Sequence, residues 1–400
     1  MQVDGWLIAV ALLATGTGAC VGGVTNALAV RLLFWPRRFV GIRPWAGWQG
    51  VIPRRSADIA KRCLEASLHH TRGLEQVIRD MDTDVLARHV ISVLDDRVEE
   101  WVDDVMDAQQ AVLWENLPQS VRRRVYDWVR QQLVKRAREI VEDVTIHADD
   151  LIDFQEVLLK EFGEHPERMA ELFQLAGDNT FRQLVRYGVW LGALFGSLQF
   201  ALWYWLPSEW IWIVGAALNG WVTNWLALTL VFRPVYPKQI LGHTVQGYFM
   251  KRQPVIAGIW ARYVAEKILT FDKVAHYMVH GRYGERTQAL ITRHVKPILD
   301  EAGVIRWTLQ LAVGTNGFVQ LKEAVKIKAL EVSEEPFRDT HFQQASARRM
   351  AERLNQLLAS LSPERFQYIL IPAFESERLL LIASGALLGA LMGGLQAWII

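Results

Sequence analysis

Four long stretches of this 400-residue chain contain no charged side chain, and they set the class of fold. They cover residues 5–30, 187–208, 210–232 and 379–400. A helix needs about 20 apolar residues to cross about 30 Å of hydrocarbon, and each stretch has that length. A soluble protein can bury one such helix, but four indicate an integral membrane protein. The sequence therefore predicts an all-α integral membrane protein with four transmembrane helices.

The chain also repeats its own sequence at a nearly constant interval. TNALAVRLLFWP at residues 25–36 recurs as TNWLALTLVFRP at 223–234, and LGALFGSLQ at 191–199 recurs as LGALMGGLQ at 388–396. A constant offset along the whole chain is typical of internal duplication. We therefore expect two parallel tandem repeats related by an axis along the membrane normal.

The basic residues predict the orientation of the chain. The short link between the second and third stretches carries Glu209 and no basic residue, whereas arginines flank the long charged segments. Because Lys and Arg mark cytoplasmic ends, we expect both charged segments in the cytoplasm and both termini outside. We do not expect the first stretch to be a cleavable signal, since no Lys or Arg precedes it and it carries the repeated motif.

The predicted parts of the chain follow from these stretches. They are the first transmembrane helix with its exit motif (1–36), a first cytoplasmic helical domain (37–186), a transmembrane hairpin of helices 2 and 3 (187–232), a second cytoplasmic helical domain (233–378) and the fourth transmembrane helix (379–400).

A small set of polar side chains lies inside the membrane stretches, at corresponding places in the two repeats. The set consists of Thr25, Asn26, Thr223, Asn224, Gln199 and Gln396. An amide in hydrocarbon is costly unless it is paired. One interpretation is that these groups join helices through hydrogen bonds. The other is that they line a polar pathway between the two repeats.

Glycines form a regular ridge in the second and fourth stretches. The two triplets are Gly188, Gly192 and Gly196, and Gly385, Gly389 and Gly393, each spaced by four residues. Small residues at this spacing let helix backbones approach closely where lipid supplies no hydrophobic drive. We expect these glycines to be helix-packing positions.

The cytoplasmic segments show the period of long helices. Apolar residues recur every three or four positions over residues 85–112 and again over 121–144, with Pro118 between the two runs. The first run is acidic and the second is basic outside its apolar stripe. This pattern favours an antiparallel, coiled-coil-like hairpin with flanking ion pairs. The alternative is a stripe left open for a protein partner or a second copy of the chain.

Each exit motif is followed by aromatic residues and a pair of cations. The pairs are Arg54 with Arg55, and Lys251 with Arg252. Aromatic rings and cations next to a bilayer suit an interfacial loop that contacts lipid phosphates. Simple anchoring of the topology is the alternative interpretation.

Enzyme and cofactor signatures are weak in this sequence. It contains no GxSxG, P-loop or HExxH motif, and its two cysteines have no zinc-finger spacing. Asp272, His276 and His280 share one helical face and form a weak metal candidate without a fourth ligand. The net charge of +1 gives no reason to expect nucleic acid. We expect no catalytic residues and no cofactor.

These motifs resemble those of a bacterial family, the membrane proteins of domain of unknown function 445, which includes the YheB and YjiN proteins. The resemblance rests on the TN-x-LA and Phe-x-Pro exit motif at residues 25–36, on GVIPRR at 50–55 and on GALLGALMGGLQ at 385–396. The second copy has Met250 where Pro53 stands in the first. The resemblance implies the cytoplasmic membrane of a bacterium and implies no particular activity.

From these observations we expect a non-enzymatic helical scaffold of the inner membrane, or an envelope-associated binding module that contacts lipid headgroups at the cytoplasmic face. The alternative is a transporter or channel for a small solute or lipid, with a pathway between the two repeats. A pathway needs polar side chains that face a common axis. A scaffold needs a surface left open on the cytoplasmic helices.

Overall fold

In the computed structural model, the described residues are 5–42, 46–68, 82–240, 242–371 and 378–399. Over these residues the chain is helical apart from two short β-hairpins, and it divides into two compact units. Unit 1 comprises Met1–His69, Leu159–Trp260 and Asn355–Ile400, and unit 2 comprises His70–Leu158 and Ala261–Leu354. Each unit therefore takes residues from both charged segments, whereas the sequence suggested two separate domains, 37–186 and 233–378.

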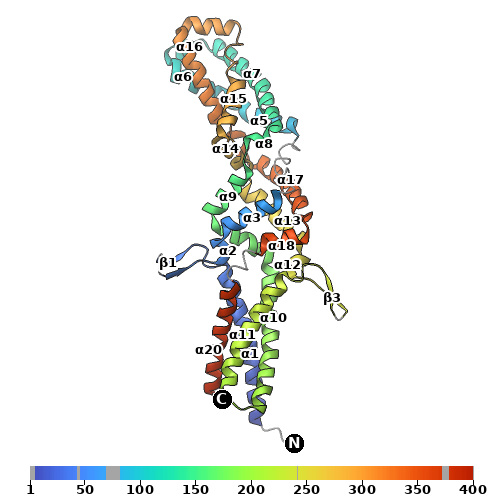
Figure 1. Ribbon diagram of the computed structural model, residues 1–400. Coiled ribbons are helices and arrows are strands. Elements are labelled where there is room, and N and C mark those ends of the chain that lie inside the picture. The colour runs from blue at the N-terminus through green and yellow to red at the C-terminus, as the bar shows by residue number, and fades with distance from the viewer. Residues whose placement is uncertain (1–4, 43–45, 69–81, 241, 372–377, 400) are drawn as a thin grey trace. The chain divides into compact units, whose positions relative to one another are not determined.

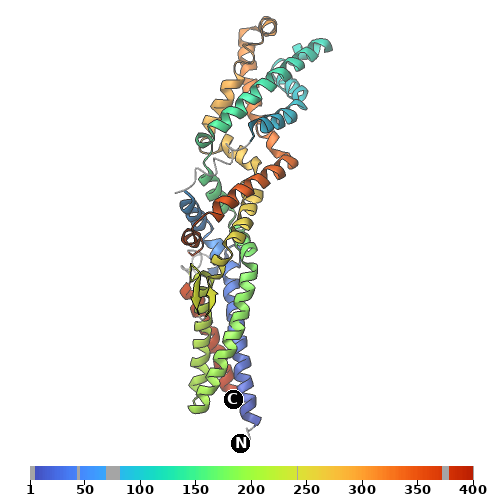
Figure 2. The same cartoon turned by 90° about the vertical axis from the view of Figure 1, so that its right-hand side faces the viewer.

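Four long helices form the main part of unit 1. They are α1 (Gly5–Phe34), α10 (Pro166–Trp205), α11 (Glu209–Phe232) and α20 (Arg378–Ile399). Helix α1 packs along α10 and α11 packs along α20, while α1 also contacts α11 and α20. The start of α1, the turn between α10 and α11, and the end of α20 lie at the same end of this bundle (Figures 1 and 2).

Among the described residues, α1, α11 and α20 are long and apolar enough to cross a membrane. The remaining predicted span, residues 187–208, forms the end of α10. That helix begins at Pro166, inside the charged segment, and runs without interruption to Trp205. The predicted boundary at residue 187 is therefore not the start of a helix, and the four-span count stays a prediction.

The long helices are apolar on the outside and closely packed on the inside. Exposed rows four residues apart consist of Trp190, Leu194 and Leu198 on α10, and of Leu387, Leu391 and Leu395 on α20. The two glycine triplets of these helices, together with Gln199 and Gln396, are buried instead. Exposed apolar rows around a core that contains amides suit a surface covered by lipid and not by water.

Short elements follow the cytoplasmic ends predicted for the spans. Strands β1 (Val40–Ile42) and β2 (Ala46–Trp48) form one antiparallel hairpin, with Val40 opposite Trp48. Strands β3 (Lys238–Ile240) and β4 (His243–Val245) form another, with Lys238 opposite Val245. The helices that complete unit 1 are α2 (Val51–Arg54), α3 (Ser56–Leu68), α12 (Tyr248–Lys251), most of α13 (Gln253–Tyr263) and α18 (Pro363–Leu370).

Unit 2 consists of amphipathic helices whose apolar stripes face one another. Its elements are α5 (Thr83–Asp95), α6 (Val98–Asn116), α7 (Gln119–Ile146), α8 (Ala148–Leu151), the π-helical turn η1 (Val264–Ile268), α14 (Phe271–His280), α15 (Gly284–Val295), α16 (Val304–Val332) and the 3₁₀ turn η2 (Glu335–Arg338). Helices α9 (Phe154–Glu164) and α17 (Thr340–Ala359) run from one unit into the other. One core cluster joins Leu86, Leu94, Trp101, Val141 and Val332, so α5, α6, α7 and α16 bury their stripes together.

The predicted acidic rod over residues 85–112 is divided into two helices. Helix α5 ends at Asp95 and α6 begins at Val98, and a second kink falls at Gln110. The break leaves Leu94 and Val98 both buried, so the stripe stays on the core while the helix axis changes direction. A coiled coil over the whole rod is therefore not present in the described residues.

The ion pairs expected between the acidic and basic helices are formed. Arg130 of α7 lies 2.8 Å from Glu99 of α6, and Arg138 lies 2.8 Å from Asp84 of α5. These pairs are largely exposed, so they favour the antiparallel register more than they add free energy of folding.

Candidate functional site

The two asparagines of the exit motifs occupy equivalent positions. The side-chain nitrogen of Asn26 donates to the backbone oxygen of Leu184 at 2.9 Å, and that of Asn224 donates to Leu381 at 2.8 Å. Both asparagines are almost fully buried. Each hydrogen bond joins two helices that pack along each other, α1 with α10 and α11 with α20. The geometry matches the first of the two interpretations, hydrogen bonding between helices.

One polar atom in the side chain of each of four membrane amides has no hydrogen-bond partner among the described residues. The Oδ1 atoms of Asn26, Asn224 and Asn219, and the Nε2 atom of Gln396, make no hydrogen bond. A buried polar atom without a partner costs about 1–3 kcal/mol. Asn219 was not predicted from the sequence, although an amide inside an uncharged stretch is itself a signal. Its nitrogen lies 3.4 Å from the oxygen of Gly192.

The remaining polar residues of the membrane stretches make local or interhelical bonds. The hydroxyl of Thr25 donates to Gly22 at 3.3 Å, and that of Thr223 donates to Asn219 at 2.8 Å, each within its own helix. Gln199 donates to the backbone oxygens of Ile211 and Trp212, which ties α10 to α11. Gln396 accepts from Thr17 at 3.1 Å, which ties α20 to α1.

The two glycine triplets lie where the helix backbones touch. A Cβ atom added at Gly188, Gly192 or Gly196 would overlap the backbone of α1 at Gly22, Gly18 or Ala14. One added at Gly385, Gly389 or Gly393 would overlap the backbone of α11 at Gly220, Ala216 or Trp212. The structure thus places both triplets in the tight contacts that their spacing suggests.

A Gln-Gly pair fixes the chain just after each exit motif. Gln49 donates to the backbone oxygen of Arg37 at 3.1 Å, and Gly50 donates to Pro36 at 3.0 Å. In the second copy, Gln246 donates to Val235 at 2.9 Å and Gly247 to Pro234 at 2.9 Å. Trp35–Pro36 and Arg233–Pro234 are both cis peptides. This role of the two pairs was not predicted from the sequence.

The basic pairs lie at the ends of the short helices α2 and α12. Arg54 and Lys251 are exposed, whereas Arg55 and Arg252 are partly covered. Arg55 lies 3.5 Å from Asp58. Helix α2 packs on α1 and α10, and α12 packs on α10 and α11, so both pairs lie beside the ends of the apolar helices. This position suits contact with lipid headgroups, the use that the sequence suggests.

Unit 2 contains an apolar cavity of about 570 Å³ that is partly open to its surroundings. Side chains from α5, α6, α7, α14, α15 and α16 line it, among them Leu94, Trp101, Leu133, Met278, Ile291 and Val325. Ligand sites in proteins commonly measure about 300–1,000 Å³ and combine an apolar lining with a few polar groups. The volume and the lining of this cavity fall within that range.

A few polar atoms interrupt the apolar lining. Thr287 and Gln132 are lining residues, and the hydroxyl of Thr287 and the side-chain oxygen of Gln132 are buried with no hydrogen-bond partner among the described residues. Arg136, another lining residue, has an unpaired Nε atom. None of these three residues was predicted from the sequence, because nothing in their local pattern separates them from other polar positions of amphipathic helices.

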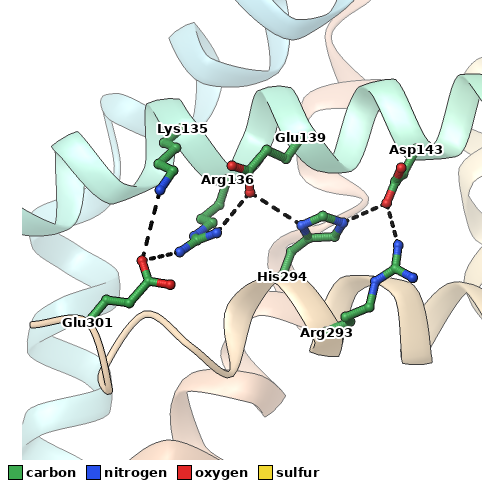
Figure 3. Close-up of polar contacts among 7 residues, drawn as sticks. All are labelled: Lys135, Arg136, Glu139, Asp143, Arg293, His294 and Glu301. Atoms are coloured by element: carbon green, nitrogen blue, oxygen red, sulfur yellow. Dashed lines mark hydrogen bonds and ion pairs between the residues drawn. The ribbon is translucent and has the colours of Figure 1, made fainter.

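A charged network ties α7 to α15 beside this cavity (Figure 3). His294 lies between two carboxylates, with its Nε2 2.8 Å from Asp143 and its Nδ1 3.4 Å from Glu139. Arg136 bridges Glu139 at 2.9 Å and also pairs with Glu301. Because α7 and α15 belong to different charged segments of the chain, this network holds the two segments together.

The same network shifts the pKa of Asp143. The hydrogen bond with His294 lowers this pKa below its usual range, burial opposes the shift, and the Arg293 guanidinium lowers the pKa further. A different effect operates at Tyr126 on the same helix, where burial and a hydrogen bond to Asp103 raise the pKa to about 12. Asp143 therefore stays ionised and Tyr126 stays neutral at neutral pH.

The metal candidate from the sequence is changed by the structure. His276 and His280 come together with Glu334, and their candidate ligand atoms all lie within 4.8 Å of one another. Asp272, which the sequence pattern predicted as a third ligand, does not join this group. Glu334 was missed because it lies in a distant segment, and only the packing of α16 against the rest of unit 2 brings it to α14.

Parts of the chain are similar to bacterial membrane proteins. UPF0754 membrane proteins of Anoxybacillus flavithermus, Bacillus thuringiensis and Shouchella clausii are 26% identical over 95 residues, 29% over 137 and 31% over 99. The aligned regions cover 23%, 34% and 24% of this chain, and 26%, 33% and 26% of the three relatives.

The chain thus spans about a quarter to a third of the length of the relatives it matches. No family model matches it, and the resemblance to domain of unknown function 445 stays a prediction. The similarity and the three apolar helices of unit 1 together support a membrane location. The chain is a helical membrane protein that is similar in part to bacterial UPF0754 membrane proteins.

Proposed function

We propose that this protein is a non-enzymatic binding module of the bacterial inner membrane, and that unit 2 holds the acyl chain of a membrane lipid. Four spans anchor it, with both termini outside and unit 2 in the cytoplasm, as the distribution of basic residues suggests. The observation that carries the proposal is the apolar cavity of about 570 Å³ in unit 2.

The chemistry of the cavity selects the kind of ligand. Its lining is almost entirely aliphatic and aromatic, so the main part of the ligand has to be hydrocarbon. Each buried CH₂ group contributes about 0.8 kcal/mol, which makes an acyl chain a favourable occupant. The spans keep the protein at the bilayer, where acyl chains are the most abundant apolar groups.

The unpaired polar atoms of the cavity suggest an amphipathic lipid and not a plain hydrocarbon. Thr287 and Gln132 offer a hydroxyl and an amide oxygen that have no partner among the described residues. A lipid hydroxyl or carboxyl group would supply the missing hydrogen bonds, which removes the cost of leaving these atoms unpaired. Arg136 and Lys328 add positive charge to the lining, although both already pair with acidic side chains.

The experiment starts from full-length protein purified in detergent. Lipid extracted from it is identified by mass spectrometry, and a fluorescent fatty-acid analogue is titrated into delipidated protein. Ala137→Phe and Ala275→Phe enlarge two side chains in the cavity lining, and Ala108→Phe on an exposed position of α6 is the matched control. We expect the two cavity variants to bind the analogue at least about tenfold more weakly than the control.

A second variant protects the test against simple misfolding. Thr287→Val keeps the side-chain shape and removes the hydroxyl, so it should leave the fold intact and weaken only ligands with a polar head. Absence of copurified lipid, together with equal binding by the cavity variants and the control, would contradict the proposal.

A transporter or channel is the second candidate, and the unpaired amide atoms in unit 1 favour it. Asn26, Asn219 and Asn224 each leave a buried oxygen without a partner among the described residues. A solute or water passing between the two helix pairs would supply hydrogen bonds to these oxygens. The glycine contacts close the interface inside each pair, so a pathway would run between the pairs. Solute flux in reconstituted vesicles, lost in the Asn26→Leu and Asn224→Leu double variant, would support this candidate.

A further inference from the structure

His276 and His280 present two imidazoles on one face of α14. They are one helical turn apart, and their ring centroids lie 4.9 Å from each other. Their side chains are 57% and 55% exposed, so both rings are accessible from solvent. Two imidazoles spaced by four residues on a helix are suitable ligands for a transition-metal ion.

Glu334 brings a carboxylate to the same point. One of its oxygens, Oε1, lies 3.3 Å from Nδ1 of His276 and 3.1 Å from Nε2 of His280. The Glu334 side chain is only 12% exposed. In spite of these short distances, Oε1 accepts no well-directed hydrogen bond from the described residues. The carboxylate is thus buried and faces two ring nitrogens, with an oxygen left unsatisfied.

Neighbouring contacts hold Glu334 in place. Glu335 lies 2.5 Å from Arg97, and the backbone oxygen of Pro336 lies 2.8 Å from Nε2 of His89. Phe337 packs against the core cluster of unit 2. The turn that carries Glu334 is therefore fixed by the three residues that follow it, and the carboxylate is positioned before any ligand binds.

Two of the three separations between the candidate ligand atoms agree with a tetrahedral metal site, and the nitrogen–nitrogen separation is within 4.8 Å. Zinc–nitrogen bonds of about 2.0–2.1 Å place neighbouring tetrahedral ligand atoms about 3.3 Å apart. The two nitrogen–oxygen separations, 3.3 and 3.1 Å, are close to that value. Two imidazoles and one carboxylate suit Zn²⁺ and related ions such as Co²⁺ better than Mg²⁺ or Ca²⁺, which prefer oxygen ligands.

We propose that His276, His280 and Glu334 bind a divalent transition-metal ion of the zinc class, with water completing its coordination. Nδ1 of His276, Nε2 of His280 and Oε1 of Glu334 are the three protein ligands. Arg338 lies 3.6 Å from the other carboxylate oxygen and leaves Oε1 to the ion. The ion would join α14 to the turn after α16 and so stiffen unit 2.

The test uses full-length protein purified in detergent through a tag without histidines and stripped of metal with a chelator. Co²⁺ is titrated at neutral pH while its visible absorption is recorded, and Zn²⁺ is then added as a competitor. We expect one Co²⁺ per chain with the intense absorption of a tetrahedral site, displaced by Zn²⁺. Saturation with no such absorption, or no binding at all, would overturn the proposal.

Variants identify the ligands. Glu334→Gln keeps the shape of the side chain but removes the charge, and His276→Ala and His280→Ala each remove one imidazole. Each should raise the Kd for Co²⁺ by at least about tenfold. His147→Ala, an exposed histidine elsewhere in unit 2, is the matched control and should bind as the unaltered protein does. Equal affinity of Glu334→Gln and the control would reject Glu334 as a ligand.

A measurement on the unaltered protein covers the case in which a variant fails to fold. Diethyl pyrocarbonate modifies accessible histidines, and mass spectrometry reports the extent of modification at each one. Zn²⁺ should protect His276 and His280 at least about fivefold and leave the exposed His147 and His341 unchanged. Equal modification with and without Zn²⁺ would mean that the cluster is only a histidine–carboxylate ion pair.

Discussion

The side-chain nitrogen of Asn26 donates a hydrogen bond to the backbone oxygen of Leu184 across 2.9 Å. Asn224 and Leu381 form the same contact at 2.8 Å between the other two long helices. Gly188 and Gly385 lie directly against these amides, where a Cβ atom would overlap the amide group. An amide and a glycine therefore lie together in the contact between the two helices of each pair, at corresponding places in the two pairs. The contribution of each residue to this contact can be tested by substitution.

Replacing the asparagines should separate a structural role from a transport role. We expect Asn26→Leu and Asn224→Leu each to lower the free energy of unfolding by about 0.6–2 kcal/mol, the range for one hydrogen bond between membrane helices. The measurement is thermal unfolding of detergent-purified protein. Asn179→Leu, an exposed amide on α10, is the control.

The double variant gives the decisive result for the amides. If they only join helices, any functional loss should follow the loss of folded protein. A double variant that stays fully folded and loses solute flux would assign the amides to a pathway. One that stays folded and keeps full lipid binding and flux would remove them from both roles.

The glycine contacts predict a strong dependence on side-chain size. Gly192→Leu and Gly389→Leu should force α1 from α10 and α11 from α20, because a side chain at either position overlaps backbone atoms of the facing helix. We expect each to lower the free energy of unfolding by several kcal/mol, as overpacking costs at least about 1–3 kcal/mol.

Two glycines of the same helices provide the controls. Gly16 and Gly394 have nothing within 4 Å of an added Cβ atom. Gly16→Leu and Gly394→Leu should therefore melt within a few degrees of the unaltered protein. If Gly389→Leu and Gly394→Leu melt alike, the contact between α11 and α20 does not stabilise the protein.

The sequence predicted the parts of the fold that depend on local pattern. The uncharged stretches form long apolar helices, and the glycine spacing predicted close backbone contacts, because both depend on residues within one helix. The break after Asp95 and the uninterrupted helix from Pro166 to Trp205 were not predicted. Their positions depend on which residues the rest of the molecule buries, and the local period of apolar residues carries no such information.

The candidate site was predicted only in part for the same reason. His276 and His280 were predicted as metal ligands because they are four residues apart, and Asp272 was included because it continues that spacing. Glu334 comes to this point through tertiary packing, so no local signal identifies it. The apolar cavity was also missed, because a stripe of apolar residues does not show whether its packing leaves a space.

The network around Asp143 predicts a loss of stability in acid. The pKa of Asp143 is lowered in the folded protein, and the hydrogen bond with His294 is the largest cause. The unfolded value is about 3.9, so the carboxylate contributes its full stabilisation above that pH. The contribution is lost as the pH falls through the lower folded pKa. We expect the melting temperature to fall in that acidic range and to change little from this group between pH 5 and pH 7.

Asp143→Asn tests this assignment because it keeps the shape and removes the charge. At pH 7 it should cost on the order of 1 kcal/mol, since the pair is only partly buried. The difference from the unaltered protein should shrink below the folded pKa, where Asp143 is itself neutral. Asp107→Asn, on an exposed position of α6, should show no such convergence. A constant difference at every pH would mean that the charge of Asp143 does not contribute.

The predicted orientation in the membrane can be tested with single cysteines. Cys20 and Cys63 are replaced by serine, and one cysteine is then placed either at Ser208, in the turn between α10 and α11, or at Asp107, on an exposed position of α6 in unit 2. Because basic residues stay on the cytoplasmic side, a membrane-impermeant maleimide should label Ser208→Cys in intact cells. Asp107→Cys should react only after the cells are permeabilised.

Labelling of Asp107→Cys in intact cells would place unit 2 outside and contradict a cytoplasmic binding module. Protection of both positions, with reaction of both after permeabilisation, would show that α10 and α11 do not form a transmembrane hairpin, and the four-span arrangement would then be wrong.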